Sequence, residues 1–355
     1  MSFEQELVSQ AERQLRGLLA SLPLVLERAV TESAGADLAL ELREGERRWT
    51  LVCEVKANGE PRHLRAAALQ ARELASRFAA SGPAYAVVVA PFISEASGAI
   101  CRELGVGYAD LAGNCRLAFG STYIEKRVAG NPFHVKREQR SLFAPKSARV
   151  LRIMLGAPSR EWKVAELAER AGVSYGQVSK LRQALLDREW AAGRWGGVQL
   201  AQPQALLEAW RQAYAPLRTA RKRYYTLLHG EELQRALREV FAAPGGQALL
   251  SSFSAARWLA PYARMAGEFF YADAAGEVRL KALLRLEPAA RGENVTIDLA
   301  SDEGVFQEAM EAAPGLRCTG LIQTWLDLAA AGERGGEAAQ HLFDERIAPL
   351  WKSEA

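Results

Sequence analysis

A glycine between two apolar helical patterns is the feature that most constrains folding in this chain of 355 residues. Val164 and Leu167 begin an apolar face at the spacing of a helix. Gly172 follows this face, and glycine readily adopts the positive φ that a tight turn between helices requires. Ser174 and Gln177 then form a Ser-x-x-Gln capping box, the pattern that begins a second helix. The sequence therefore predicts two short helices joined by a tight turn.

The second of these helices has two distinct faces. Val178, Leu181 and Leu185 fall on the inward face at helical spacing. The outward face has no acidic side chain and consists of Tyr175, Gln177, Ser179, Lys180 and Arg182. An apolar face opposite a polar, basic face predicts a helix that packs on its own domain and presents cations to a partner.

A hairpin is expected after this helix, in the glycine-rich stretch "AAGRWGGVQL". With the helical pattern "SARVLRIMLGAP" before them, these features resemble a winged helix-turn-helix DNA-binding domain at 141–203. The resemblance implies that the outward side chains lie in the major groove of double-stranded DNA and read base edges there. Lys146, Arg149 and Arg194 are expected to contact phosphates. A winged helix used only for protein contact is the alternative.

Charge is distributed unevenly along the chain, although the net charge is only +3. Residues 126–223 carry 20 basic and 7 acidic side chains, whereas 1–125 carry 13 and 16, and 224–355 carry 12 and 19. A segment of net charge +13 between acidic flanks is typical of a surface that binds nucleic acid. The alternative is a solvated basic linker.

Strand and helix patterns alternate in the first 130 residues, which predicts an α/β domain at 1–130. The continuous apolar run "AYAVVVAPF" is typical of a strand in a sheet covered on both faces. The stretch "ADLALELREGERRWTLVCEVKA" predicts two strands joined near Gly45.

Strand alternation brings three charged residues of this pair toward one end of the sheet. Glu54 and Lys56 share the face opposite Leu51, Cys53 and Val55, and Asp37 begins the preceding strand. Two carboxylates beside a lysine suit a Mg²⁺ ion with an activated water, and the lysine would stabilise charge on a cleaved phosphate.

The pattern resembles the PD-(D/E)xK nucleases, whose fold is restriction-endonuclease-like. Asp37, Glu54 and Lys56 match the three motif positions, and Gln70 stands where some members have a glutamine. The resemblance implies catalysis by these residues with Mg²⁺ held by Asp37 and Glu54. The alternative is a solvated cross-strand ion pair, worth about 0–1 kcal/mol.

Residues 204–355 predict an α+β domain. A helical connector is expected over 206–230, with a basic cluster at Arg221–Arg223, and "VRLKALLRLEP" at 278–288 is interpreted as a strand. Asp298, Asp302 and Glu303 are candidates for a carboxylate site, and an exposed acidic loop is the favoured interpretation. The three segments together predict an α/β and α+β multidomain protein.

Taken in order, the segments are similar to the AbiEi-type antitoxins of type IV toxin–antitoxin systems. The likeness is carried by four stretches, "CEVKANGEPRHLRAAALQA", "GVGYADLAGNCRLAF", "RSLFAPKSARVLRIML" and "GLIQTWLDLAAAGERGGEAAQHL". The resemblance implies promoter binding, repression of a toxin operon and opposition to a partner toxin without a tight complex. A nucleotidyltransferase-like toxin, or the target of that toxin, is the partner it implies.

Three functions follow, and a DNA-binding regulator is favoured because it requires only binding and no cofactor. A Mg²⁺-dependent endonuclease targeted by the winged helix is the second, and an interaction scaffold built on the acidic C-terminal segment is the third. A cytoplasmic protein is expected, because four scattered cysteines indicate no disulfide framework and no apolar run has the length of a membrane helix. A homodimer is left open.

Overall fold

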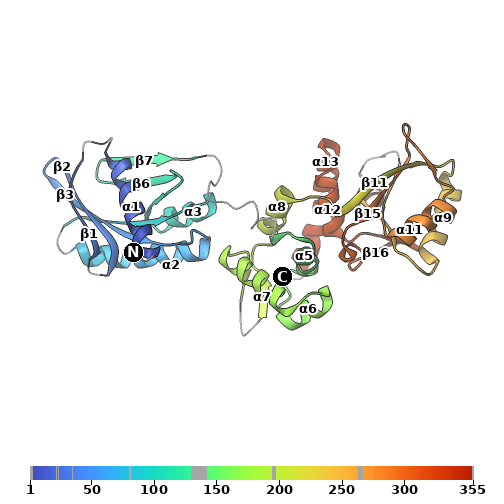
Figure 1. Ribbon diagram of the computed structural model, residues 1–355, viewed down its shortest axis with the longest axis horizontal. Coiled ribbons are helices and arrows are strands. Elements are labelled where there is room, and N and C mark those ends of the chain that lie inside the picture. The colour runs from blue at the N-terminus through green and yellow to red at the C-terminus, as the bar shows by residue number, and fades with distance from the viewer. Residues whose placement is uncertain are drawn as a thin grey trace. The chain divides into compact units, whose positions relative to one another are not determined.

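The computed structural model describes residues 3–20, 22, 24–33, 35–79, 82–128, 142–193, 197–262 and 267–353. The chain forms two compact units. The first comprises Met1–Val135 with Leu186–Glu189, and the second comprises Lys136–Leu185 with Trp190–Ala355. Both units combine helices with sheets, which confirms the mixed α/β multidomain class (Figure 1).

The first unit is built on a seven-stranded sheet in the order β1-β2-β3-β4-β5-β6-β7. Its strands are β1 (Val25–Ser33), β2 (Ala36–Glu44), β3 (Arg47–Val55), β4 (Ala84–Ala90), β5 (Gly107–Asp110), β6 (Cys115–Phe119) and β7 (Thr122–Lys126). Its helices are α1 (Phe3–Leu19), α2 (Pro61–Phe78) and α3 (Glu95–Glu103). The pairs β3–β4 and β4–β5 are parallel and the other four are antiparallel.

Helices cover both faces of this sheet. Leu7, Ala11 and Leu15 of α1 pack on one face, whereas α2 and α3 pack on the other. The apolar run of β4 alternates between the two clusters, so that Val87 contributes to one and Val88 to the other. A strand buried on both sides was predicted for this run and is confirmed.

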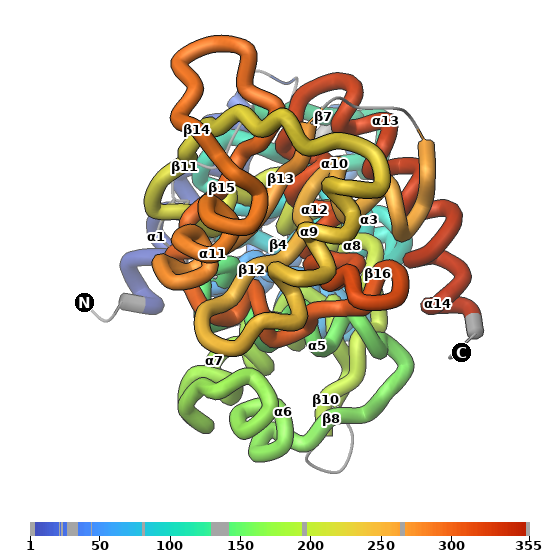
Figure 2. Tube along the Cα trace, turned by 90° about the vertical axis from the view of Figure 1, so that its right-hand side faces the viewer, coloured from blue at the N-terminus to red at the C-terminus, as the bar shows by residue number. Residues whose placement is uncertain are grey.

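The second unit begins with three helices and three short strands. They are α5 (Pro145–Gly156), β8 (Trp162–Lys163), α6 (Val164–Ala171), α7 (Tyr175–Asp187), β9 (Ala191–Ala192) and β10 (Gly197–Leu200). The strands form one sheet in the order β8-β10-β9, and α6 lies beside it (Figure 2). Gly172 ends α6 in the left-handed conformation with φ 61°, and the Ser174 hydroxyl accepts a hydrogen bond from the Gln177 N–H at 3.3 Å. The predicted turn and helix cap are therefore present.

A second seven-stranded sheet follows in the order β14-β11-β15-β13-β12-β17-β16. Its strands are β11 (Arg218–Tyr225), β12 (Ala248–Leu250), β13 (Glu268–Ala272), β14 (Glu287–Pro288), β15 (Val295–Ala300), β16 (Met310–Ala313) and β17 (Leu316–Cys318). The helical elements are α8 (Pro203–Ala213), α9 (Gly230–Ala242), α10 (Ser252–Leu259), α11 (Ala274–Leu283), η2 (Glu303–Val305), α12 (Leu321–Ala329), α13 (Glu333–Leu342), η3 (Phe343–Ile347) and α14 (Ala348–Ser353). Figure 1 shows α9 and α11 on one side of the sheet, and α12 and α13 on the other.

Two predicted elements of this sheet differ from the structure. The expected connector at 206–230 is helical only in α8, and its basic part is strand β11. Pro216 interrupts the helical pattern, because proline lacks the N–H that a helix needs. The expected strand at 278–288 is mostly helix α11, which begins where the Asp273 carboxylate accepts a hydrogen bond from the Gly276 N–H at 2.6 Å. The stretch was interpreted as a strand, and this N-terminal cap begins a helix instead.

Two further features concern membrane-spanning helices and the cysteines. In the part that the structure describes, no helix combines the length and the apolar character needed to cross a membrane. Cys53, Cys101, Cys115 and Cys318 are all buried free thiols.

Candidate functional sites

Helix α7 presents the polar face that its sequence predicts. Val178, Leu181 and Leu185 are buried beneath it. On the outer side Ser179 and Lys180 are exposed, and the exposed fraction of Tyr175 is 63%. Gln177 and Arg182 are half-buried, and these five residues therefore differ in what they can offer to a partner.

The expected phosphate-contacting residues have three different outcomes. Lys146 is exposed in the first turn of α5. Arg149 forms two hydrogen bonds of 2.8 Å with the carboxylate of Asp302, and only 15% of its side chain is exposed. Arg194 lies outside the described residues. Lys146 therefore stays a candidate for phosphate contact, whereas the guanidinium of Arg149 is already paired.

Acidic residues of the C-terminal segment neutralise much of the basic charge on β11. Asp298 accepts bonds of 2.8 and 2.7 Å from Arg221, and Glu277 accepts two bonds of 2.8 Å from Lys222. Asp298 is buried and Asp302 is half-buried, and each is held in an ion pair rather than exposed in an acidic loop. The basic cluster on β11 is thus part of the packing of the second sheet.

Asp37, Glu54 and Lys56 do come together at one end of the first sheet. The register pairs Leu38 with Cys53, so Asp37 lies opposite Glu54 one step further along. Lys56 Nζ is 2.6 Å from Glu54 Oε2 and 3.8 Å from Asp37 Oδ2. Asp37 Oδ2 also accepts a hydrogen bond of 2.8 Å from the N–H of Val55. Strand alternation alone was enough to predict this grouping.

Burial distinguishes Glu54 from its neighbours. Its side chain is fully buried, whereas 32% of Lys56 and 36% of Asp37 are exposed. Burial raises the pKa of Glu54, while the hydrogen bond and charge of Lys56 lower it, and Asp37 raises it. Glu54 Oε1 has no hydrogen-bond partner. A buried charge without a partner strongly destabilises a folded protein, so the ionised form of Glu54 depends on Lys56.

The fit of this group to Mg²⁺ rests on two carboxylates. Mg²⁺ is held by carboxylates and waters in octahedral geometry, and Asp37 and Glu54 supply two carboxylates. Among the residues that the structure describes, no group of three or more His, Cys, Asp or Glu side chains could hold a metal ion. Gln70 is exposed on α2 and makes no described hydrogen bond to Asp37, Glu54 or Lys56. These two carboxylates would therefore hold Mg²⁺ only together with waters and a substrate phosphate.

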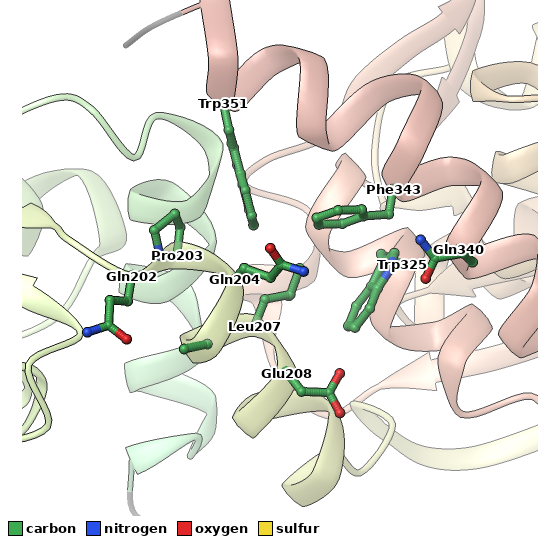
Figure 3. A pocket seen from close by; sticks show the side chains of 10 residues that line it. Gln202, Pro203, Gln204, Leu207, Glu208, Trp325, Gln340, Phe343 and Trp351 are labelled. Atoms are coloured by element: carbon green, nitrogen blue, oxygen red, sulfur yellow. The ribbon is translucent and has the colours of Figure 1, made fainter. Parts of the chain in front are cut away.

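A cleft of about 820 Å³ opens between α8 and the C-terminal helices. Figure 3 shows Leu207 and Glu208 on one side of it, with Trp325, Phe343 and Trp351 on the other. Trp351 is anchored by a hydrogen bond of 2.8 Å from its Nε1 to the carbonyl of Leu155. This bond ties Trp351 to helix α5.

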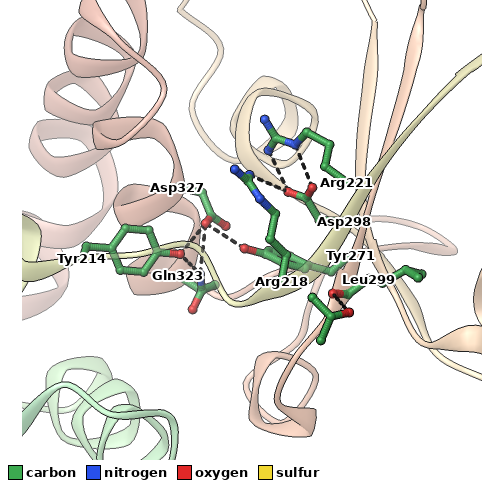
Figure 4. A network of polar contacts seen from close by, with 9 residues as sticks. Tyr214, Arg218, Arg221, Tyr271, Asp298, Leu299, Gln323 and Asp327 are labelled. Carbon is green, nitrogen blue, oxygen red and sulfur yellow. Dashed lines mark hydrogen bonds and ion pairs between the residues drawn. The ribbon is translucent and has the colours of Figure 1, made fainter. Parts of the chain in front are cut away.

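A buried polar network includes Gln323 and Asp327 of α12 (Figure 4). Tyr214 and Tyr271 both donate hydrogen bonds to Asp327 Oδ1, the second at 3.0 Å. Gln323 Nε2 donates to the Tyr214 hydroxyl at 2.8 Å and to Asp327 Oδ1 at 3.2 Å. Gln323 Oε1 accepts a bond of 3.1 Å from Arg152 of α5. The network therefore joins α5 to the core of the second sheet.

The pKa of Asp327, the carboxyl of this network, is raised. Burial raises its pKa to about 6, although the hydrogen bonds from Tyr214, Gln323 and Tyr271 act in the opposite direction. Asp327 Oδ2 has no hydrogen-bond partner. Asp327 also lines a small cavity of about 120 Å³ with Arg218, Arg221 and Asp298.

Sequence reasoning missed this network. One signal was present, because Gln323 and Asp327 stand four residues apart within the otherwise apolar stretch "LIQTWLDLA". Residues at that spacing share one face of a helix. Their partners on α5, β11 and β13 come from distant parts of the chain and had no local signal.

Comparison with known proteins bears on the segment that contains this network. Residues 199–348 match the family model described as transcriptional regulator, AbiEi antitoxin, type IV toxin–antitoxin system. The AbiEi resemblance is confirmed for this segment. No curated protein and no solved structure matches the chain.

The AbiEi segment contains most of the network but not all of it. Tyr214, Tyr271, Gln323 and Asp327 lie inside 199–348, as does Asp302, the partner of Arg149. The helices α5, α6 and α7 precede the segment. The contacts of Arg149 and Arg152 therefore connect the AbiEi segment to the helices that come before it.

Proposed function

We propose that this protein is a transcriptional regulator of the AbiEi antitoxin kind and that it binds duplex DNA through α7 of a winged helix-turn-helix. The observation that carries the proposal is the exposed face of α7, with Tyr175, Ser179 and Lys180 above a buried apolar side. The order α5-β8-α6-α7-β9-β10 supports the same proposal, because strand β8 before the helix pair and strands β9 and β10 after it form one three-stranded sheet.

The proposed contacts divide by their chemistry. Lys180 and Gln177 are proposed to read base edges, because lysine pairs with guanine and glutamine with adenine in the major groove. Lys146, exposed at the start of α5, is proposed to hold a phosphate. Arg149 is left out of this set, since its guanidinium is paired with Asp302.

Antitoxin activity is the second half of the proposal. The AbiEi match covers the C-terminal sheet and its helices, so opposition to a partner toxin is assigned to 199–348. We propose that a nucleotidyltransferase-like protein encoded beside this chain is the toxin. Co-expression should restore growth to cells that make the toxin, and growth that stays arrested at equal protein levels would count against this assignment.

DNA binding is tested by gel shift with the DNA upstream of the coding sequence. Lys180→Ala should weaken binding by about 1–3 kcal/mol if the side chain reads a base. Lys146→Ala should reduce the slope of log affinity against log salt by about 0.9, the effect of one lost phosphate contact. Arg291→Ala removes the same charge from an exposed position outside the helix pair and serves as control. Equal DNA affinities for the wild type and these three variants would refute the assignment of α7 as the helix that contacts DNA.

Endonuclease activity is not part of the proposal. The regulator requires only binding, whereas a nuclease would need Mg²⁺ on the carboxylates of Asp37 and Glu54, and Lys56 occupies one oxygen of Glu54. Supercoiled plasmid incubated with Mg²⁺ or Mn²⁺ should stay intact. Nicking that disappears in Lys56→Ala would reverse this conclusion, whereas nicking that survives the substitution would indicate a contaminant.

A further inference from the structure

A cavity of about 190 Å³ lies between α5 and the first turn of α12. Helix α5 packs against α12 there, and both belong to the second unit (Figure 1). Most of the lining is apolar and comes from Met310, Leu321, Ile322, Ile347 and Leu350. The cavity therefore suits a small molecule with an apolar body.

Arg152 supplies an unsatisfied cation to this cavity. Only 3% of the residue is exposed, and it lines the cavity from α5. Its Nη1 donates to Gln323 Oε1 at 3.1 Å, whereas Nε and Nη2 have no partner. A buried guanidinium with unsatisfied donors is strongly unfavourable unless an anion completes it.

The N-terminal end of α12 also favours an anion in this cavity. Gly320, Leu321 and Ile322 line the cavity, and they form the cap and first turn of the helix. The first N–H groups of a helix have no partner within it and attract negative charge. No side chain caps this end. A Cβ on Gly320 would stand 2.5 Å from the carbonyl oxygen of Glu308, so a capping serine or aspartate has no room there.

We propose that this cavity binds a small organic carboxylate, held by Arg152 and the first N–H groups of α12, with its apolar body against Met310, Ile347 and Leu350. A carboxylate accepts two parallel hydrogen bonds from a guanidinium, which is the number of donor nitrogens that Arg152 has left. A doubly charged phosphate fits less well, because the apolar lining would desolvate it without enough donors.

Glu308 is the acidic residue in the lining, and its charge opposes an anion. Its Oε2 is 3.5 Å from Arg170 Nη2, which partly offsets that charge. The opposing charge gives the proposal a directional test, because Glu308→Gln should strengthen carboxylate binding rather than weaken it.

Isothermal titration calorimetry of the full chain with benzoate tests the proposal. Benzamide has the same shape without the charge, and inorganic phosphate has charge without the apolar body. We expect benzoate to bind at one site, and benzamide and phosphate to bind at least about tenfold more weakly, as loss of a charge-assisted hydrogen bond implies.

Variants locate the site. Arg152→Met should lower benzoate affinity by at least about tenfold, and Arg334→Met, an exposed control, should leave it unchanged. Because Arg152 is buried, Met310→Trp is used beside it to fill the cavity while keeping the cation, and it should also abolish binding. Undetectable benzoate binding by the folded wild type, equal affinity for benzamide, tighter binding of phosphate, or benzoate affinity unchanged in both variants would each overturn the proposal.

Discussion

Arg149 of α5 and Asp302 form an ion pair with two hydrogen bonds of 2.8 Å, although 153 positions separate them in the chain. Asp302 Oδ1 also accepts a bond of 2.8 Å from the N–H of Gly304, so the same carboxylate begins the short helix η2. The pair therefore fastens the first helix of the DNA-binding candidate to the AbiEi segment. An arginine that looks like a DNA contact in the sequence has a structural role.

Arg149→Met should lower the free energy of unfolding by about 3 kcal/mol, because it leaves the nearly buried carboxylate of Asp302 without its cation. Arg211→Met is the matched control, since the Arg211–Glu208 pair is exposed and should be worth at most about 1 kcal/mol. Urea denaturation measures both. Equal losses in the two variants would contradict the structural role, as would a changed salt slope of DNA binding in Arg149→Met.

Asp327 should make stability depend on pH in an unusual direction. Its folded pKa is about 6, above its value in the unfolded chain, so the folded state binds the extra proton. The stabilisation is present below about pH 4 and is lost as the pH rises through 6, by about 3 kcal/mol in total.

Asp327→Asn should remove this dependence, because the amide oxygen can accept the three hydrogen bonds that Oδ1 accepts now. The difference in free energy of unfolding between variant and wild type should grow in favour of the variant from pH 4 to pH 8. A difference that stays constant over this range would show that the carboxyl of Asp327 does not titrate there.

Lys56 should stabilise the first unit through Glu54 rather than through a surface contact. Lys56→Met leaves the fully buried Glu54 with no cation and should cost about 2–3 kcal/mol at pH 8. Glu54→Gln in the same chain should recover most of this loss, since it removes the buried charge. Additive losses in the double variant would argue that the two side chains do not interact.

The pH dependence of Lys56→Met is a second readout of the same pair. Burial already raises the pKa of Glu54, and loss of Lys56 removes the influence that lowers it. A carboxyl with a raised pKa loses stabilisation as pH rises through that pKa, so the variant should lose more stability between pH 4 and pH 8 than the wild type does.

Two glycines of the helix pair should respond to alanine in opposite directions. Gly172→Ala forces an L-residue into φ 61° and should lower the free energy of unfolding by about 1 kcal/mol. Gly176 lies inside α7 with open space at its Cβ position. Alanine there should raise the free energy of unfolding by up to about 1 kcal/mol. Thermal unfolding of both variants compares them, and a destabilising Gly176→Ala would count against α7 as an ordinary helix at that position.

Local patterns predicted the parts of the sites that lie on one element or on neighbouring strands. The turn at Gly172 and the cap at Ser174 follow from backbone preferences within a few residues. Asp37 and Glu54 meet because a period of two and an antiparallel hairpin leave one arrangement for their side chains. The strand expected at 278–288 was wrong, because the residue that begins helix α11, the N-cap Asp273, lies before the stretch on which the expectation was based.

The sequence by itself determined the helix pair and its basic outer face, as well as the strands that carry Asp37, Glu54 and Lys56. Only the tertiary structure decided which charges are available to a partner. The partner of Arg149 is 153 positions away in the chain, and the partner of Arg221 is 77 positions away. Arg152 is buried and bonds to a glutamine 171 positions away. Secondary structure follows from local backbone geometry, whereas the burial and pairing of a charge depend on residues that only the folded chain brings within a few ångströms.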